Sequence, residues 1–167
     1  MVCDEPTSAL VVSVQAAILN LLYELQTDQS TSYLFITHDL GVVRYLADRI
    51  AVMYVGRMME VGTTEQIFGG PHHPYTEALL SAVPSVDGET KVRIRLEGEI
   101  PTPADPPPGC VFHTRCHRFI PGTCDQIEPP IQDVEPGHRM ACHIPLEELR
   151  RLQAEDQAAA EGSPASD

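Results

Sequence analysis

The fold is decided by a short apolar run that ends in polar residues, Tyr33-Leu34-Phe35-Ile36-Thr37-His38-Asp39. Aromatic and β-branched residues dominate this run, which predicts a buried β-strand. Asp39 can then cap a helix that starts at Leu40. Upstream, apolar residues recur every three or four positions over residues 12–26, which predicts an amphipathic helix with Ser13 as its candidate cap. The first residues, Met1-Val2-Cys3, are typical of the end of another buried strand.

Downstream of this run the pattern alternates again. Residues 50–55 predict a strand, Gly56-Arg57 a turn, and residues 58–61 the returning strand of a hairpin. Thr63 is expected to cap a short helix that reaches Phe68, and a further helix opens at Pro74 or Tyr75 and ends near Val83. The order strand, helix, strand, helix, strand predicts an α/β fold with at least two parallel strands.

Proline and cysteine divide the chain into two compositional halves. Of the 15 prolines, one lies in residues 1–70 and thirteen lie in residues 71–145. Residues 92–96 alternate weakly and predict at most one strand, residues 101–109 predict an extended linker, and residues 146–160 permit a helix. We therefore predict three segments, residues 1–84, 85–145 and 146–167, with a frayed tail from residue 161.

Net charge and hydropathy exclude several classes of protein. The chain carries 24 acidic and 11 basic residues, a formal net charge of −13. Such a chain repels phosphate backbones, so we expect no nucleic-acid partner. No apolar run approaches the roughly 18 residues that a membrane-spanning helix requires. The first residues do not have the pattern of a secretory signal.

Two acidic residues, Asp4 and Glu5, directly follow the first predicted strand. At the carboxyl end of a buried strand, one carboxylate can hold Mg²⁺ beside phosphates and the next can act as a general base on water. His38 ends the second strand, where an imidazole could contact a γ-phosphate. Taken alone, Asp-Glu-Pro is more typical of a turn, and a lone histidine after a strand is more often a cap or a surface residue.

Three segments in order resemble the ATP-binding cassette (ABC) ATPases. Residues 3–10 (Cys-Asp-Glu-Pro-Thr-Ser-Ala-Leu) resemble the Walker B motif and D-loop, residues 36–40 (Ile-Thr-His-Asp-Leu) the switch-histidine loop, and residues 48–57 the strand pair that follows. The resemblance implies a partial P-loop NTPase (ABC-type) sheet with helices, and ATP and Mg²⁺ as cofactors. It implies that Asp4 binds Mg²⁺–ATP, Glu5 is the catalytic base, and His38 senses the γ-phosphate.

A second resemblance narrows the family. Residues 72–80 (His-His-Pro-Tyr-Thr-Glu-Ala-Leu-Leu) are similar to the His-Pro-Tyr signature of oligopeptide/dipeptide importer ATPases, and the similarity continues to about Pro145. It implies a Pro/Cys-rich irregular C-terminal extension and a truncated ATP-binding subunit that couples ATP hydrolysis to peptide uptake. The implied partners are a second ABC ATPase subunit and transmembrane permease subunits. The implied location is peripheral, at the cytoplasmic face of the inner or plasma membrane.

The sequence departs from this family in three ways. It contains no Gly-x-x-x-x-Gly-Lys-Ser/Thr phosphate loop and no Ser-Gly-Gly-Gln segment before Asp4. Val11 stands where the D-loop of the family has an aspartate that helps to couple the two ATP sites. We therefore expect the chain to correspond to the C-terminal half of such an ATPase, from Walker B onward. It should be inactive alone, and Val11 should impair cooperative hydrolysis.

Four of the five cysteines cluster in the second half, Cys110, Cys116, Cys124 and Cys142. Four thiolates on irregular backbone are typical of a metal site, and the missing secretory pattern disfavours disulfides. Some dipeptide-importer ATPases carry a [4Fe–4S] cluster on four cysteines in this extension, so the resemblance favours that cluster over Zn²⁺, with unmetallated thiols as a third interpretation. Cys3 is expected in a buried strand. Three nearby histidines are expected outside the ligand set, His113, His117 and His143.

The competing hypothesis is a non-enzymatic metal-binding or interaction module. The cysteine cluster and the missing phosphate loop support it, but it leaves the three ATPase-like segments in residues 4–57 unexplained. A redox electron carrier is a third hypothesis, supported by the thiols alone.

Overall fold

The computed structural model describes residues 1–8, 10–83 and 93–161. It is a mixed α/β structure whose contacts divide the chain into two compact units, Met1–Asp48 and Arg49–Asp167. Each unit is described by itself. The boundary predicted between residues 84 and 85 lies inside the second unit, in which strands from both sides of that boundary share one sheet.

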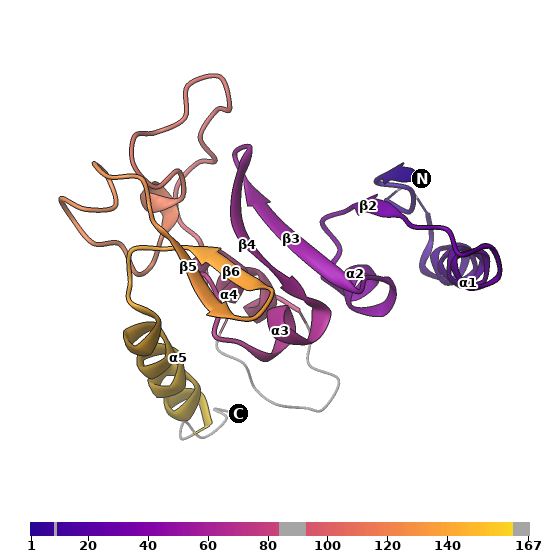
Figure 1. The fold of residues 1–167 in the computed structure, drawn as a ribbon. Coiled ribbons are helices and arrows are strands. Elements are labelled where there is room, and N and C mark those ends of the chain that lie inside the picture. The colour runs from indigo at the N-terminus through magenta and orange to yellow at the C-terminus, as the bar shows by residue number, and fades with distance from the viewer. Residues whose placement is uncertain (9, 84–92, 162–167) are drawn as a thin grey trace, which may run out of the picture. The chain divides into compact units, whose positions relative to one another are not determined.

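The first unit alternates strands and helices as expected. Its elements are β1 (Val2–Asp4), α1 (Val12–Gln29), β2 (Leu34–Ile36) and α2 (Leu40–Leu46). The two strands pair in parallel, with Cys3 opposite Phe35 and Asp4 opposite Ile36 (Figure 1). The predicted parallel pair is confirmed, and both carboxyl ends lie at one edge of the pair.

Helices α1 and α2 differ in whether a side chain caps the backbone amides of their first turn. The Asp39 side chain accepts hydrogen bonds from the backbone amides of Gly41 and Val42, which confirms it as the cap of α2. The predicted cap Ser13 is wrong, because α1 begins at Val12. Its N-cap is Val11, two residues before Ser13, and the Val11 side chain cannot accept a hydrogen bond.

The prediction that these strands are buried is also wrong for this chain. Val2 is 66% exposed and Leu34 is 61% exposed, and Cys3 is only half-buried. An apolar run shows that a strand can be buried when a second layer covers it. These strands are exposed because a two-stranded sheet covers little of its own surface.

The second unit is built on a four-stranded antiparallel sheet in the order β3-β4-β6-β5. Its strands are β3 (Arg49–Tyr54), β4 (Arg57–Thr63), β5 (Ile131–Glu135) and β6 (His138–Ala141). The predicted β3–β4 hairpin is confirmed, but its two-residue turn is Val55-Gly56, with positive φ at both positions, rather than Gly56-Arg57.

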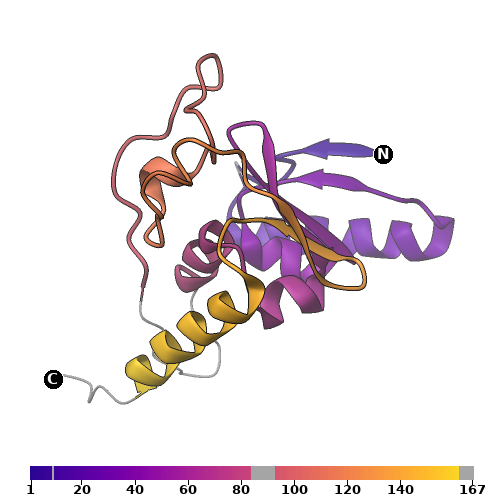
Figure 2. The same cartoon turned by 60° about the vertical axis from the view of Figure 1, so that its left-hand side comes forward.

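The β5–β6 hairpin lies beside β4 (Figure 1, Figure 2). The sequence predicted irregular backbone for the residues of this hairpin. Its prolines did not exclude a strand, because they stand just before β5 and in the turn after it. Residues 93–96 form no strand, and Val92 lies outside the described residues. Residues 101–109 are not fully extended, because the amide of Asp105 closes a turn onto the carbonyl of Thr102.

In the described part of this unit, three α-helices and one short 3-10 helix accompany the sheet. They are α3 (Thr64–Gly69), α4 (Pro74–Ser81), η1 (His113–Arg115) and α5 (Leu146–Glu161). Thr63 caps α3, as predicted, in a reciprocal capping box with Gln66. His73 caps α4 with its ring, and Pro74 occupies the first helical position.

The core of the second unit has two parts. One joins the end of the β3–β4 hairpin to the cysteine-bearing loops, with Tyr54 and Phe112 in edge contact at a ring-centroid distance of 5.2 Å. The other packs β5 and β6 against the start of α5, where Leu149 is fully buried. Among the described residues, no helix is long and apolar enough to span a membrane.

Candidate functional site

The predicted catalytic residues of the first unit come together at the carboxyl edge of the parallel pair. The Nδ1 atom of His38 lies 3.1 Å from Oε1 of Glu5. Glu5 directly follows β1, and its amide extends the ladder by donating to the carbonyl of Ile36. Its backbone has φ of 42°, which is uncommon for a residue with a side chain. Crevices outside the carboxyl ends of parallel strands are the usual ligand sites of α/β sheets.

Further polar groups surround this edge. Asp4 ends β1 and is exposed, so its carboxylate is accessible to a cation. Asp39 caps α2 with one oxygen and accepts a hydrogen bond from Gln15 of α1 with the other, at 3.2 Å. The Glu5 and His38 side chains are 50% and 77% exposed. Val11, in the D-loop position, is also exposed.

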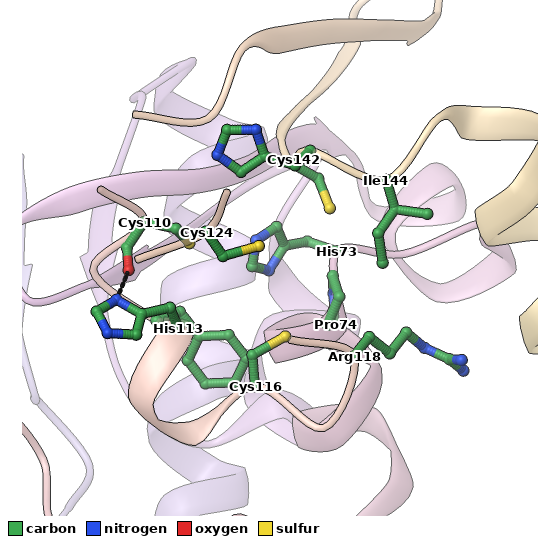
Figure 3. A pocket seen from close by; sticks show the side chains of 11 residues that line it. His73, Pro74, Cys110, His113, Cys116, Arg118, Cys124, Cys142 and Ile144 are labelled. Carbon is green, nitrogen blue, oxygen red and sulfur yellow. Dashed lines mark hydrogen bonds between the residues drawn. The ribbon is translucent and has the colours of Figure 1, made fainter. Parts of the chain in front are cut away.

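The four clustered cysteines line one pocket of the second unit. Figure 3 shows their side chains directed toward a common space, with the ring of His73 and the side chain of Ile144 in its wall. The five cysteines of the chain, all among the described residues, are free thiols. The sequence prediction that these four approach one another is confirmed at the level of a shared pocket.

Burial raises the pKa of three of these thiols, Cys110, Cys116 and Cys142, and so favours their protonated form. Burial, with a smaller contribution from the neighbouring cysteines, raises the pKa of Cys116 to about 12 and that of Cys142 to about 11. Backbone amides oppose this effect. The amide two residues after each cysteine, in Phe112, Arg118 and Ile144, hydrogen-bonds a sulfur and lowers the pKa of Cys110, Cys116 and Cys142 respectively.

The spacing of the thiols does not form a ready site for one ion. Within the described ranges, no three His, Cys, Asp or Glu side chains are arranged to hold a metal ion. Four sulfurs around Zn²⁺ would lie about 3.8 Å apart, because each Zn–S bond is about 2.3 Å long. The cavity has a volume of about 10 Å³, roughly what one water needs, so a larger group requires the thiols to turn outward.

The histidines beside the cysteines have other partners. The Nδ1 atom of His113 lies 2.8 Å from the carbonyl of Cys110, and Nε2 of His143 lies 2.8 Å from the carbonyl of Ile127. His117 contacts Glu77 at 3.2 Å. These contacts are consistent with the prediction that the three rings are not metal ligands, which stays a prediction.

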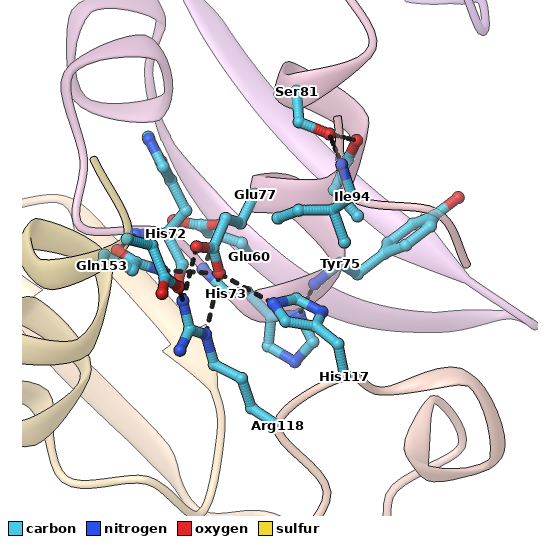
Figure 4. Close-up of polar contacts among 12 residues, drawn as sticks. Glu60, His72, His73, Tyr75, Glu77, Ser81, Ile94, His117, Arg118 and Gln153 are labelled. Carbon is cyan, nitrogen blue, oxygen red and sulfur yellow. Dashed lines mark hydrogen bonds and ion pairs between the residues drawn. The ribbon is translucent and has the colours of Figure 1, made fainter. Parts of the chain in front are cut away.

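Glu77 of α4 is the centre of a polar network that sequence reasoning missed (Figure 4). Arg118 donates to it through Nε at 3.0 Å and Nη2 at 2.7 Å, and Gln153 of α5 donates at 3.1 Å. Burial alone would raise the pKa of Glu77, but hydrogen bonds from His117 and Arg118 outweigh it and lower the pKa to about 2. The carboxylate is therefore ionised throughout the neutral range.

A second network, fully buried, joins α4 to the sheet. Glu60 of β4 accepts a hydrogen bond from the amide of His73 at 2.9 Å and lies 2.7 Å from Nε2 of His138. Burial lowers the pKa of His73 to about 4. Its ring is therefore neutral at pH 7, with Nδ1 accepting from the amide of Tyr75 and the ring hydrogen-bonded to the carbonyl of Ala141. A lone acid within a strand is the signal that could have indicated such a network.

Comparison with known proteins shows which protein family this chain resembles. Residues 59–124 match the family described as "Oligopeptide/dipeptide transporter, C-terminal region". The chain is 50% identical over 143 residues to the dipeptide transport ATP-binding protein DppF of Escherichia coli, a match that covers 85% of this chain and 42% of DppF. It is 50% identical over 147 residues to the oligopeptide transport ATP-binding protein AppF of Bacillus subtilis, covering 86% of this chain and 44% of AppF.

The chain thus spans less than half the length of the curated relatives that it matches. Because the matches extend over about 85% of this sequence, they include His38 in the first unit as well as His73 and the segment of Cys110, Cys116 and Cys124 in the second. From these matches, the chain belongs to the ATP-binding proteins of the oligopeptide/dipeptide transporters and carries their C-terminal region.

Proposed function

We propose that this chain supplies the hydrolytic edge of the ATP-binding subunit of a peptide ABC importer, which uses ATP hydrolysis to drive oligopeptide or dipeptide uptake. The observation that carries the proposal is the 3.1 Å contact between Glu5 and His38 at the carboxyl edge of a parallel strand pair. The positive φ of Glu5 supports it, because unusual backbone angles concentrate at functional sites.

Each residue at this edge has a distinct role in the proposal. Mg²⁺, when bound, neutralises charge on the phosphates, and Asp4 is the carboxylate that would hold it. Glu5 would accept a proton from the attacking water, and His38 would hold Glu5 in place while its exposed ring contacts the γ-phosphate. The proposed partners are a second ABC ATPase subunit and transmembrane permease subunits, at the cytoplasmic face of the membrane.

The proposal also assigns limits to this chain. Phosphoryl transfer depends on positioning, and this sequence has no Gly-x-x-x-x-Gly-Lys-Ser/Thr loop to cradle phosphates. The chain alone should therefore not hydrolyse ATP above background. Val11 should weaken coupling between two ATP sites, because an exposed apolar side chain cannot make the polar contact of the family's aspartate.

A chimera tests the catalytic assignment. The segment of E. coli DppF that precedes its match to this chain is fused to residue 1, and ATP hydrolysis is measured with Mg²⁺. Glu5→Gln should lower kcat about 100-fold or more, as expected for loss of a general base. Glu24→Gln, at an exposed acid of α1, is the matched control and should leave kcat unchanged. Equal loss in both variants, or in neither, would contradict the role of Glu5.

We further propose that the cysteine pocket of this subunit holds a [4Fe–4S] cluster, with Zn²⁺ as the alternative. Support comes from four free thiols that line one pocket, and from the backbone at Phe112, Arg118 and Ile144, which lowers the pKa of three of them. Amide hydrogen bonds stabilise thiolates and tune the potential of such clusters. A cluster would also tie together loops that have few aliphatic residues.

Metal analysis after anaerobic purification tests this second proposal. About four irons per chain with visible absorption would support the cluster, whereas one colourless zinc would favour the alternative. Cys124→Ser should abolish iron retention, and Cys3→Ser, in the other unit, should not. Retention of iron by Cys124→Ser would overturn the assignment.

A further inference from the structure

We propose that helix α4, which begins with the His-Pro-Tyr sequence, positions the two loops that carry Cys116 and Cys142. Glu77 is the positioning residue for the first loop and His73 for the second. The inference rests on the proposed function only in that these thiols are taken to be ligands. The placement of the loops can be measured without any metal.

The first contact holds the loop of Cys116. Both residues that follow this cysteine, His117 and Arg118, point their side chains at Glu77 (Figure 4). The Arg118 guanidinium donates two hydrogen bonds to the Glu77 carboxylate, which fix the orientation of the two groups as well as the distance between them. Moving Glu77 therefore moves the two residues that directly follow Cys116.

The pair is held from a third side. Arg118 also reaches Asp156 of α5 at 2.6 Å, and Gln153 of α5 bridges Glu77 and the carbonyl of His72. The side chains of Arg118 and Glu77 are 9% and 13% exposed, so their interaction is screened little by solvent. Breaking such a pair leaves a buried charge without its partner, which costs much more than losing a surface ion pair.

The second contact holds the loop of Cys142. The ring of His73 forms part of the pocket wall and hydrogen-bonds the carbonyl of Ala141, the residue before this cysteine. The His73 amide is itself fixed by Glu60, which also holds His138 at the start of β6. Strand β6 is therefore tied to α4 and β4 at its start, and to His73 at the end that leads into Cys142.

Gln132 holds the same loop from the side of β5. Its Nε2 donates to the carbonyls of Cys142 and Ile144, at 2.7 and 2.8 Å. The Cys142 loop thus has anchors on α4 and on β5, whereas the Cys116 loop is held by Glu77 and, through Arg118, by the exposed Asp156. Loss of His73 should release its cysteine less than loss of Glu77 releases Cys116.

The other two cysteines are joined to each other by a backbone contact of their own, within a core against which Tyr75 of α4 also packs. The amide of Cys110 donates to the carbonyl of Cys124 at 2.8 Å, and the chain at Gly109 lies against the same carbonyl. This backbone crossing joins the Cys110 and Cys124 loops to each other. The two cysteines therefore serve as internal references for any change at α4.

Site-resolved thiol labelling of the full metal-free chain tests the inference. The reduced protein is pulsed with N-ethylmaleimide, and the labelling of each cysteine is read by mass spectrometry. Glu77→Gln should speed labelling of Cys116 about tenfold by favouring local opening, and His73→Asn should speed labelling of Cys142 by a smaller factor. His73→Asn keeps a side-chain oxygen able to cap α4 while shortening the reach toward Ala141.

Selectivity separates positioning from general stability. Glu65→Gln, at the exposed first-turn acid of α3, is the matched control and should change no rate. Cys110, Cys124 and Cys3 should keep their wild-type rates in every variant. A uniform rise at all pocket cysteines, or no rise at Cys116, would overturn the inference. If Glu77→Gln does not fold, Arg118→Lys, which keeps the charge but loses the two-pronged grip, should give the same pattern more weakly.

An iron measurement separates this inference from the proposed cluster. If the wild-type chain takes up iron, Glu77→Gln should lose it to a chelator about tenfold faster and alter its visible spectrum, while Glu65→Gln should match the wild type. If the wild-type chain takes up no iron, the cluster proposal fails, and the labelling pattern alone still decides the role of α4.

Discussion

Two polar sites of this molecule, one in each unit, differ in their exposure to solvent. Glu5 and His38 lie 3.1 Å apart in the first unit with side chains that are 50% and 77% exposed. Glu77 and Arg118 lie 2.7 Å apart in the second unit with side chains that are 13% and 9% exposed. Because the Glu5–His38 contact is exposed, it stabilises the fold little and a ligand can reach it. The Glu77–Arg118 contact is buried and holds the backbone of the two segments that it joins.

The difference shows that a similar contact distance can serve opposite purposes. An exposed acid and imidazole contribute little to folding and remain available for proton transfer. A buried, doubly hydrogen-bonded pair is unavailable for chemistry and orders the backbone that leads to the cysteines. Substitutions should therefore separate the two regions by their effect on the free energy of unfolding.

The largest expected effect is at the buried acid of β4. Glu60→Ala removes the partner of both His138 and the His73 amide and should lower the free energy of unfolding by about 3 to 5 kcal/mol. Urea unfolding followed by near-UV circular dichroism of the Tyr54–Tyr75–Phe112 ring cluster measures it. Glu65→Ala, at an exposed acid, should cost less than about 0.5 kcal/mol. Similar losses in the two variants would contradict the buried network.

The backbone crossing beneath the cysteine pocket should be nearly as sensitive. Gly109 has φ of 68°, and a Cβ there would lie 2.4 Å from the carbonyl oxygen of Cys124. Gly109→Ala should therefore cost about 3 kcal/mol or more. Gly122→Ala is the control, because Gly122 has φ of 76° with open space around it, and should cost about 1 kcal/mol from backbone strain alone. Equal costs would show that the crossing can relax.

Acid should destabilise the second unit in two steps. Burial lowers the pKa of His73 from 6.5 to about 4, so the unfolded chain binds the proton first and stability falls between those pH values. Glu77, whose folded pKa is about 2 because His117 and Arg118 outweigh its burial, loses its contribution as pH falls from about 4.5 to 2. The His73 step is on the order of 3 kcal/mol.

Urea unfolding at a series of pH values measures both steps. His73→Asn should flatten the fall between pH 6.5 and 4 and leave the lower step in place. Glu77→Gln should do the reverse. A wild-type protein whose stability does not change between pH 6.5 and 4 would show that His73 is not held neutral by burial.

The smallest expected effect is in the first unit. His38→Ala removes an exposed contact and should change the free energy of unfolding by no more than about 0.5 kcal/mol. Far-UV circular dichroism of α1 in urea measures it, and Tyr33→Ala near the start of β2 provides a second reference point. A loss above about 2 kcal/mol would mean that the Glu5–His38 contact is structural, and the comparison between the two regions would fail.

Local sequence signals identified much of the first unit and its candidate site. The run from Tyr33 to Asp39 indicated a strand followed by a capped helix, and both are present. Asp4 is the last residue of β1, and Glu5 and His38 come after β1 and β2, so parallel pairing places all three at one edge. These features depend on neighbours in sequence, on side-chain period and on the hydrogen-bonding capacity of single residues.

Less of the second unit could be predicted from the sequence. The prolines near residues 129–136 led to a prediction of irregular backbone where the β5–β6 hairpin lies. Proline excludes a strand only where the ladder needs the amide that proline lacks, and these prolines lie outside the two strands. Glu60, Glu77 and Arg118 look like ordinary surface charges in the sequence, since charged residues are exposed in most proteins. Their burial depends on segments up to 78 residues apart, as in the Glu60–His138 contact.

The sequence by itself determined the alternation of strands and helices, the caps at Asp39 and Thr63, and which residues could carry phosphate or metal chemistry. Only the tertiary structure decided that α4 links two of the cysteine loops to the sheet and to α5. Caps and periodicity arise within a few residues of chain, where propensity and hydrogen bonding act directly. Long-range polar contacts form only when hydrophobic burial has already brought distant segments together and excluded water from between them.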